Sequence, residues 1–440
     1  MNRLSTLNPQ PSTRLELGAF PVDEIAFGSG TRYRDGRLEV DPEELLAIAR
    51  RDPRIAGVAL DLARPGESVR IVNVQDVVEP RLKVEGPGVA YPGVAGRSTE
   101  TVGQGRTLRL AGLGVVTCAD LLPYKSAPFT IFRGSIDMTG PGAAWPYGTL
   151  HNLCLTYQTD PSIDYPERNH AAWDASFAVA ARLAQTVAGQ TPPETAVYEI
   201  GPADPALPKV ALILNVHSVE HHSGTVFGFG ESVYGLSRLH PPWPLQPTEI
   251  LDGCIARRHS WLNANDPLVQ DMIGRHGRDF AFVGVIVQRT RWSYQPEKDL
   301  TAHQTAKLAR MLGADGVLIT SDVGGNDFVE VALTVRACIR EGLTTVFMST
   351  EESSEDGAKP PWLFPIPEAD AVVSLGSGRG AFGRAGDAGR PAVARAIGGP
   401  VLYADGDALD GAPVPATGPA PGGAGGDGRW GSSRLSCFDY

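Results

Sequence analysis

The sequence of 440 residues has no long hydrophobic run. Its longest apolar segments, such as residues 280–287, have the length of a buried strand and fall far short of the roughly 20 residues that a membrane-spanning helix needs. Residues 1–17 are polar, with scattered prolines, and contain no apolar core of the kind found in a secretion signal. The sequence therefore predicts a soluble, cytoplasmic protein.

Positive charge is also scarce. The chain has 39 Lys and Arg against 50 Asp and Glu, which gives a formal net charge of -11. Nucleic acids and anionic membrane surfaces bind clusters of Lys and Arg, and this sequence has no polybasic segment. We therefore expect neither nucleic acid nor a membrane as a partner.

Cysteines are few and widely spaced. None of them forms a CxxC pair, and their odd number leaves one unpaired in any disulfide scheme. We expect most of them to be small buried residues. The five are Cys118, Cys154, Cys254, Cys338 and Cys437.

The length predicts two α/β domains. In the first, residues 1–205, short strands and turns accompany two helices, so we expect a mixed α+β domain. One helix begins after Asp41, with Pro42 at its first position, and the other covers residues 169–188. A tail rich in Gly, Pro and Ala, residues 404–440, is predicted to be ordered at most in part.

The second domain, residues 206–403, alternates apolar strands with helices that end at glycine. This pattern is typical of a doubly wound parallel sheet covered on both faces. Helices are predicted over residues 301–312 and 328–341. The strands are predicted over residues 210–216, 280–287, 316–320, 344–348 and 371–375.

Six motifs, spread over most of the chain, resemble one protein family. The first reads LARPGESVRI, in which β-branched and charged residues alternate around a Pro-Gly turn. The motifs lie at residues 62–71, 77–88, 103–107, 136–143, 247–253 and 369–374. Together they are similar to the proprotein that supplies the α and β subunits of component B in the glycine/sarcosine/betaine reductase family.

The resemblance implies a reaction, but the sequence lacks one feature on which the family's reaction depends. The family cleaves the C–N bond of small amino acids reductively, and its proproteins are cut at an internal cysteine that becomes a pyruvoyl group. The family's cysteine-containing stretch follows a segment that matches residues 251–253, but here residues 254–263 follow directly and the stretch is missing. The resemblance therefore implies an unprocessed component B-like subunit without pyruvoyl. It would act on a small amine or amino-acid-like substrate, in a hetero-oligomer with a thiol- or selenol-bearing subunit similar to the family's γ subunit.

Two residues near the missing stretch could still attack a preceding carbonyl. Cys254 is a catalytic candidate, although residues 251–255 look like a strand in which its thiol would be buried. Ser260, which follows His259, could also cleave the backbone. Neither residue has the family's local context, so we predict that the chain remains uncut.

Polar residues follow each predicted strand of the second domain. Loops at the carboxyl ends of parallel strands converge, and helix N-termini there can bind a carboxylate. Glu351 could stabilise a cationic amine, while a solvated acidic loop is the alternative. We predict a substrate site that contains Asn215, Asp322, Gly325, Asn326 and Glu351.

The run from His217 to His222 is rich in groups that can bind zinc or iron. It matches H-x-x-E-H formally, but that motif requires a helix and this run follows a strand. A metal in another geometry and polar loop histidines remain open, as does a proton-donating role for His221 or His222. The candidate metal ligands are His217, Glu220, His221 and His222. A metal-dependent enzyme and a non-catalytic scaffold subunit are thus the two rivals of the reductase interpretation.

Overall fold

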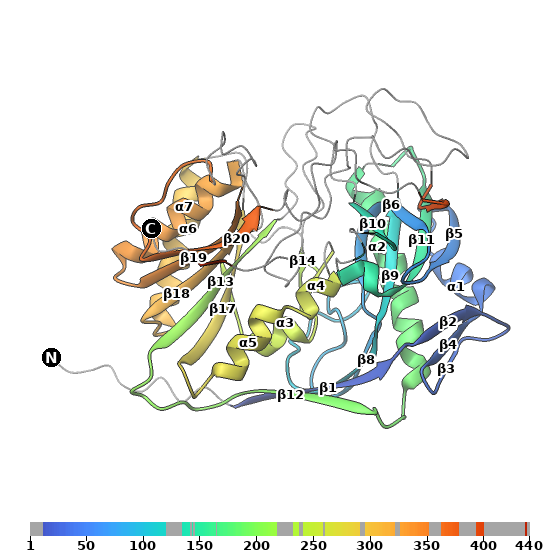
Figure 1. The fold of residues 1–440 in the computed structure, drawn as a ribbon, viewed down its shortest axis with the longest axis horizontal. Coiled ribbons are helices and arrows are strands. Elements are labelled where there is room, and N and C mark those ends of the chain that lie inside the picture. Colours follow the sequence, from blue (N-terminus) through green and yellow to red (C-terminus); the bar gives the residue numbers. More distant parts are fainter. Residues whose placement is uncertain are drawn as a thin grey trace.

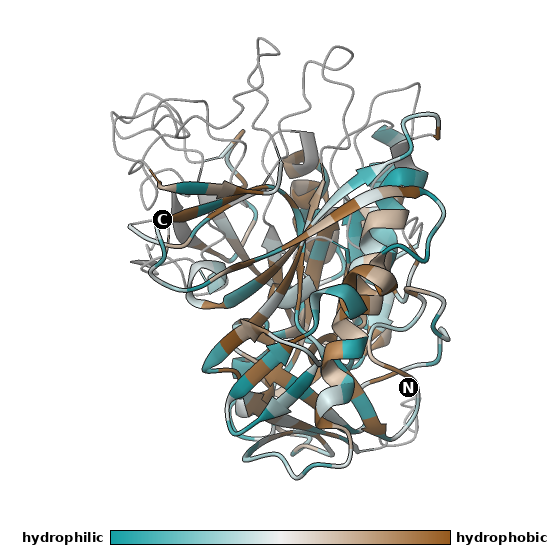
Figure 2. Ribbon diagram, turned by 90° about the vertical axis from the view of Figure 1, so that its right-hand side faces the viewer, coloured by the Kyte–Doolittle hydropathy of each residue, from teal (hydrophilic) through white to brown (hydrophobic). Residues whose placement is uncertain are grey.

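The computed structural model shows two lobes with helices between them (Figure 1). Hydrophobic and hydrophilic residues alternate along many of the strands, as expected for sheets with a buried face (Figure 2). The structure describes residues 12–119, 134–140, 143, 146–163, 165–217, 232–236, 241–257, 260–290, 295–321, 326–351, 362–377, 393–399 and 436–437.

The first lobe contains two larger sheets and one small one. The first has the order β12 (Glu194–Ile200), β1 (Thr13–Pro21), β8 (Gly105–Ala111), β7 (Arg81–Glu85). The second has the order β10 (Gly134–Asp137), β6 (Val69–Val78), β9 (Leu113–Ala119), β11 (His151–Thr159), β5 (Ile55–Ala63), and β21 (Arg395–Ile397) also pairs with β6. The small sheet has the order β2 (Glu24–Phe27), β4 (Arg37–Val40), β3 (Arg32–Arg34).

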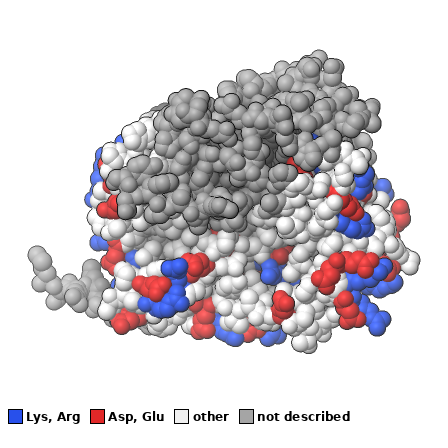
Figure 3. All heavy atoms as spheres, viewed as in Figure 1, with Lys and Arg blue, Asp and Glu red and all other residues white. Residues whose placement is uncertain are grey.

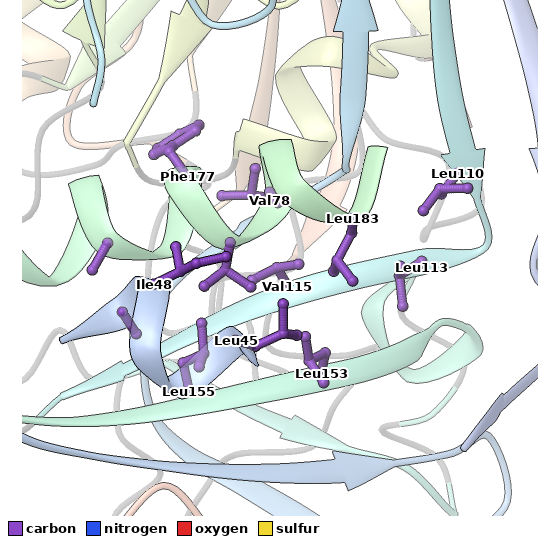
Figure 4. Close-up of a cluster of buried hydrophobic side chains, with 14 of the residues drawn as sticks. Leu45, Ile48, Val78, Leu110, Leu113, Val115, Leu153, Leu155, Phe177 and Leu183 are labelled. Atoms are coloured by element: carbon purple, nitrogen blue, oxygen red, sulfur yellow. The ribbon is translucent and has the colours of Figure 1, made fainter. Parts of the chain in front are cut away.

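Two helices complete the core of this lobe (Figure 4). The predicted helix after Asp41 is α1 (Pro42–Ala49), and the Asp41 side chain accepts hydrogen bonds from the amides of Glu43 and Glu44. The longer helix α2 (Tyr165–Ala184) begins four residues before the predicted start and gives way to the 3-10 turn η3 (Gln185–Val187). A second 3-10 turn, η2 (Pro146–Thr149), precedes β11. The core joins α1 and α2 to the strands through Leu45, Ile48, Val78, Leu110, Leu113, Val115, Leu153, Leu155, Phe177 and Leu183.

The second lobe contains the predicted parallel sheet, which confirms the α/β fold class. Its five central strands are parallel and its two edge strands are antiparallel to their neighbours. The order is β15 (Trp243–Leu245), β17 (Ala281–Thr290), β13 (Lys209–His217), β18 (Gly316–Ser321), β19 (Thr344–Glu351), β20 (Ala371–Ser377), β22 (Ser436–Cys437).

Helices cover both faces of this sheet, as a doubly wound fold requires. On one face, α6 (Gln295–Met311) and α7 (Asn326–Arg340) pack against the alternate residues Ala211 and Ile213 of β13. On the other, α3 (Pro247–Leu251) and α5 (Pro267–Arg275) pack against Leu212 and Leu214. The two helix pairs lie on opposite sides of the sheet in Figure 1.

The segment around Cys254 differs from the prediction. Residues 251–255 were expected to be one strand, but Leu251 ends α3 and only Ile255–Ala256 form a strand, β16, which pairs with β14 (Ser232–Val233). The physical reason lies upstream. Pro247 occupies the first turn of α3, and Gln246 and Glu249 form a capping box, so a helix forms over residues 247–251 and includes the first residue of the expected strand.

Two short segments from late in the sequence complete the sheets. β21 lies within the predicted second domain but pairs with β6 of the first lobe. β22 belongs to the predicted tail, of which the structure describes residues 436–437, and it pairs with β20. No helix among the described residues is both long and apolar enough to cross a bilayer. On the described surface in Figure 3, Lys and Arg are interspersed with Asp and Glu.

Candidate functional site at the carboxyl edge of the parallel sheet

The described members of the predicted substrate and metal sites lie at one edge of the parallel sheet. Asn215 and His217 are near the carboxyl end of β13, Glu351 ends β19, and Asn326 begins α7 after β18. Because β13, β18 and β19 are parallel, these positions share the carboxyl edge. The other candidates lie outside the described residues: Glu220, His221, His222, Asp322 and Gly325.

The chain reverses its winding direction at β13. The connection from β13 to β17 contains α3 and α5 on one face of the sheet, whereas the connections that contain α6 and α7 lie on the opposite face. The helices that follow β13 and the helix that follows β18 therefore lie on opposite faces, although the two strands are adjacent. In open α/β sheets ligands bind in the crevice at such a switch point.

Asn215 connects the two strands at the switch point. Its Nδ2 donates a hydrogen bond of 2.6 Å to the backbone carbonyl oxygen of Thr320 on β18. The Asn215 side chain is buried, and it lies on the face covered by α6 and α7, since it alternates with Ala211 and Ile213. The structure thus fixes one predicted substrate-binding residue at the switch point by a specific contact.

A second buried amide lies on the neighbouring strand β17. Gln288 Oε1 accepts a hydrogen bond of 2.6 Å from Thr305 Oγ1 of α6, and its Nε2 donates one of 2.8 Å to Thr334 Oγ1 of α7. Gln288 therefore fixes both helices to the sheet at the level of Asn215, its neighbour across the two strands. Gln288 was not predicted from the sequence, because a glutamine at the end of an apolar run gives no signal of its own.

Charged residues are buried at the same end of the sheet. Arg289 of β17, Lys298 of α6 and Glu330 of α7 are at most 2% exposed. Fully buried charges are rare unless they are paired or hydrogen-bonded. Buried charged side chains therefore gather at this end of the sheet, and binding sites contain a few such polar groups.

The predicted metal site is only partly within the described chain. His217 ends β13, whereas its three predicted co-ligands lie outside the described residues. No group of three or more His, Cys, Asp or Glu in the described part of the chain is arranged to hold a metal ion. The metal set therefore remains a prediction.

Cys254 lies away from the sheet edge, beside β16. Its side chain is 1% exposed, and burial raises the pKa of the thiol well above its usual value. A thiol in such surroundings is protonated at neutral pH, and the thiolate is the nucleophilic form. The predicted catalytic role of Cys254 remains a prediction, and its surroundings are those of a buried structural cysteine.

Three of the motifs meet around Asp252, although they are far apart in sequence. Asp252 Oδ2 accepts hydrogen bonds from Lys83 Nζ at 2.5 Å and from the Gly103 amide at 2.7 Å. Its Oδ1 accepts one of 2.5 Å from Thr107 Oγ1. We call these four residues the Asp252 junction. It ties β7 and β8 of the first lobe to the turn after α3, and no pattern in the sequence pointed to it.

Neighbouring buried groups extend this contact. Arg81, fully buried on β7, pairs with Glu79 and donates to the backbone carbonyl oxygens of Leu251 and Ala264. Tyr234 OH donates to Glu249 Oε1, and burial raises the pKa of Glu249. These contacts hold α3 and the segment after it against the first lobe.

Ser260 is also anchored to the first lobe by hydrogen bonds. It begins α4 (Ser260–Ala264), and its Oγ donates a hydrogen bond of 2.6 Å to Asp76 Oδ2 on β6. The Ser260 amide donates to Asp76 Oδ1 at 2.9 Å, and the Arg257 amide donates to Ser260 Oγ at 2.8 Å. Residues on both sides of the position where the family's cleavage stretch is expected are therefore anchored to the first lobe.

Comparison with known proteins agrees with the resemblance seen in the motifs. The family model for glycine/sarcosine/betaine reductase component B subunits matches residues 13–382. The sarcosine reductase complex component B subunit alpha of Peptoclostridium acidaminophilum is 34% identical over 382 residues, which cover 83% of this chain and 86% of that protein. The glycine reductase complex component B subunits alpha and beta of Acetoanaerobium sticklandii are 31% identical over 383 residues, 83% of this chain and 85% of that protein.

A third relative acts in another complex of the same kind. The betaine reductase complex component B subunit alpha of Peptoclostridium acidaminophilum is 30% identical over 382 residues, which cover 83% of this chain and 84% of that protein. No solved structure matches the chain.

Proposed function

Because the chain belongs to the family of glycine/sarcosine/betaine reductase component B subunits, we propose that it is the substrate-binding subunit of a reductase complex that acts on a small amine or amino-acid-like molecule. The observation that carries this proposal is the extent of the match. It extends over residues 13–382, which include strands of both lobes and the Asp252 junction between them.

The carboxyl edge of the parallel sheet is the proposed substrate site. There the amides at the start of α7 favour a carboxylate, because they carry the positive end of the helix dipole. Glu351, at the end of β19, would stabilise an amine cation, and His221 or His222 would donate a proton to the departing amine. Asn215 lies on β13, the strand next to β18, which precedes α7.

Reductive C–N cleavage also requires a thiol or selenol as the attacking group. Four cysteines of the described chain are free and buried: Cys118, Cys154, Cys254 and Cys338. Burial raises the pKa of each thiol, to about 12 for Cys338, so none of these four offers an accessible thiolate. This supports a separate γ-like subunit that brings the reactive chalcogen.

The chain is further proposed to act without cleavage and without a pyruvoyl group. The hydrogen bonds of Asp252 and Ser260 support this, since they anchor the chain to the first lobe before and after the position where the cleavage stretch is expected. The test is the intact mass of the purified protein, which should be a single species of about 46.7 kDa. Two fragments, one starting with a pyruvoyl group, would contradict the proposal.

The partner is tested by co-expression with a γ-like subunit. We expect one complex in size-exclusion chromatography at micromolar concentration, because interfaces of standard size persist there. The same complex should turn over a small amine in the presence of a dithiol. A stable complex that binds no amine would support the scaffold alternative. Separate elution of the two proteins would contradict the proposed partner.

A further inference from the structure

One polar atom of Asn215 is left unused by the fold. The side chain is 6% exposed, and its Nδ2 donates to Thr320 O. Its Oδ1 is buried and has no hydrogen-bond partner. The opposite orientation of the amide would place two acceptor oxygens against each other, so the contact with Thr320 determines which atom remains. That atom is the acceptor, Oδ1.

Buried polar side chains in folded proteins nearly always have a partner, and an exception calls for an explanation. Gln288, on the adjacent strand, shows the usual situation, since both ends of its amide are bonded to Thr305 and Thr334. Asn215 differs in lying at the switch point, between two adjacent strands whose following helices cover opposite faces of the sheet. An acceptor that is fixed, buried and unsatisfied at this place is suited to a ligand that brings a hydrogen-bond donor.

We infer that Asn215 determines substrate specificity by accepting a hydrogen bond at Oδ1 from an N–H group of the ligand. This rests on the proposed function, which supplies the amine. It adds that the ligand is a primary or secondary amine, because a quaternary ammonium has no N–H to donate and would leave Oδ1 unsatisfied. Sites built to hydrogen-bond a ligand group discriminate strongly against analogues that lack the group.

Calorimetric titration of the full-length protein with three probes tests the inference. The probes are glycine, N-methylglycine and N,N,N-trimethylglycine, which differ in the number of N–H groups. The first two should bind the wild-type protein about tenfold or more tightly than the third, as one hydrogen bond to a buried acceptor provides. In Asn215→Leu this preference should disappear, mainly because the first two bind more weakly.

Thr13→Val is the matched control. Thr13 Oγ1, on β1 of the first lobe, is also buried without a partner, so the variant removes an unsatisfied oxygen outside the proposed site. All three affinities should be those of the wild type. The wild-type comparison needs no variant, so the inference remains open to refutation even if Asn215→Leu does not fold.

The outcomes separate the inference from the proposed function. Equal binding of the three probes to the wild type, or an unchanged preference in Asn215→Leu, overturns the role of Asn215 and leaves amine binding intact. Tighter binding of the trimethyl compound overturns it as well. If none of the three probes binds, the proposed substrate class fails and the inference fails with it.

Discussion

Two buried polar regions of this molecule differ in how completely their hydrogen-bonding groups are used. At the Asp252 junction both carboxylate oxygens have partners, supplied by Lys83, Gly103 and Thr107. At the carboxyl edge of the parallel sheet, Asn215 uses only the donor half of its amide. A fully bonded cluster stabilises the contact that it spans, whereas an unsatisfied acceptor costs stability unless a ligand completes it.

The difference assigns separate roles to the two regions. The junction connects the lobes, and the hydrogen bonds of its side chains run to one another and to the protein backbone. The carboxyl edge contains a group whose second partner the described fold does not supply. Substitutions at the two places should therefore affect different properties, stability in the first case and ligand affinity in the second.

The largest effect is expected for Asp252→Asn. The change leaves the Lys83 ammonium buried at 3% exposure without its counter-ion, and breaking a buried ion pair by removing one partner typically costs about 3–5 kcal/mol. Urea unfolding followed by circular dichroism should show this loss. The exposed pair of Arg278 and Asp279 is the control, since Asp279→Asn should change stability by less than about 1 kcal/mol. Equal effects of the two changes would contradict a structural role for the junction.

The junction also illustrates what the sequence can and cannot predict. Strand periodicity predicted the parallel sheet and the edge that contains Asn215, because apolar strands ending in polar loops are a local signal. The buried Arg81 and Lys83 were not predicted, since long charged side chains are normally exposed and their burial depends on Leu251 and Asp252, far along the chain. The strand predicted over residues 251–255 was wrong at its start, because Pro247 and the capping box of Gln246 and Glu249 place Leu251 in α3.

A smaller loss of stability is expected for Gly93→Ala, which tests the contact beside the junction. Gly93 has φ +74°, and an added Cβ would lie 2.0 Å from the carbonyl oxygen of Tyr234, which is backbone and cannot rotate away. Gly96 has φ +73° but open space around the same position. Gly96→Ala should therefore cost only the backbone strain, about 1–2 kcal/mol, and Gly93→Ala clearly more. Thermal unfolding of both variants measures the difference, and equal melting temperatures would show that the two lobes are not closely packed here.

The pH dependence of stability should reveal His170 of α2, near Arg257. Burial, and then the Arg257 guanidinium, lower the pKa of His170 below its usual 6.5. The unfolded state then binds more protons, so the contribution of His170 to stability is present above pH 6.5 and is lost as the pH falls toward the lower folded-state pKa. Urea midpoints measured from pH 7 to pH 5.5 should fall.

The variant His170→Gln should flatten this fall. Some slope should remain, because burial also lowers the pKa of His151. Glu249 acts in the opposite sense, since burial raises its pKa in the folded state. An unchanged slope in His170→Gln would show that folding does not lower the pKa of His170. His303→Gln, on the exposed side of α6, is the control.

The smallest effect on stability is expected for Asn215→Leu, although its effect on binding is the largest proposed for the site. The substitution removes the hydrogen bond to Thr320, worth about 1 kcal/mol, but also removes a buried acceptor whose desolvation costs about 1–3 kcal/mol. The two terms oppose each other, so the melting temperature without ligand should be unchanged or slightly higher.

Gln288→Leu is the matched control on the same face of the sheet. It leaves the hydroxyl groups of Thr305 and Thr334 without their amide partner and should cost about 1–3 kcal/mol. If Asn215→Leu destabilises the protein as much as Gln288→Leu does, the Asn215 amide is part of the structural network, and the contrast between the two buried regions does not hold.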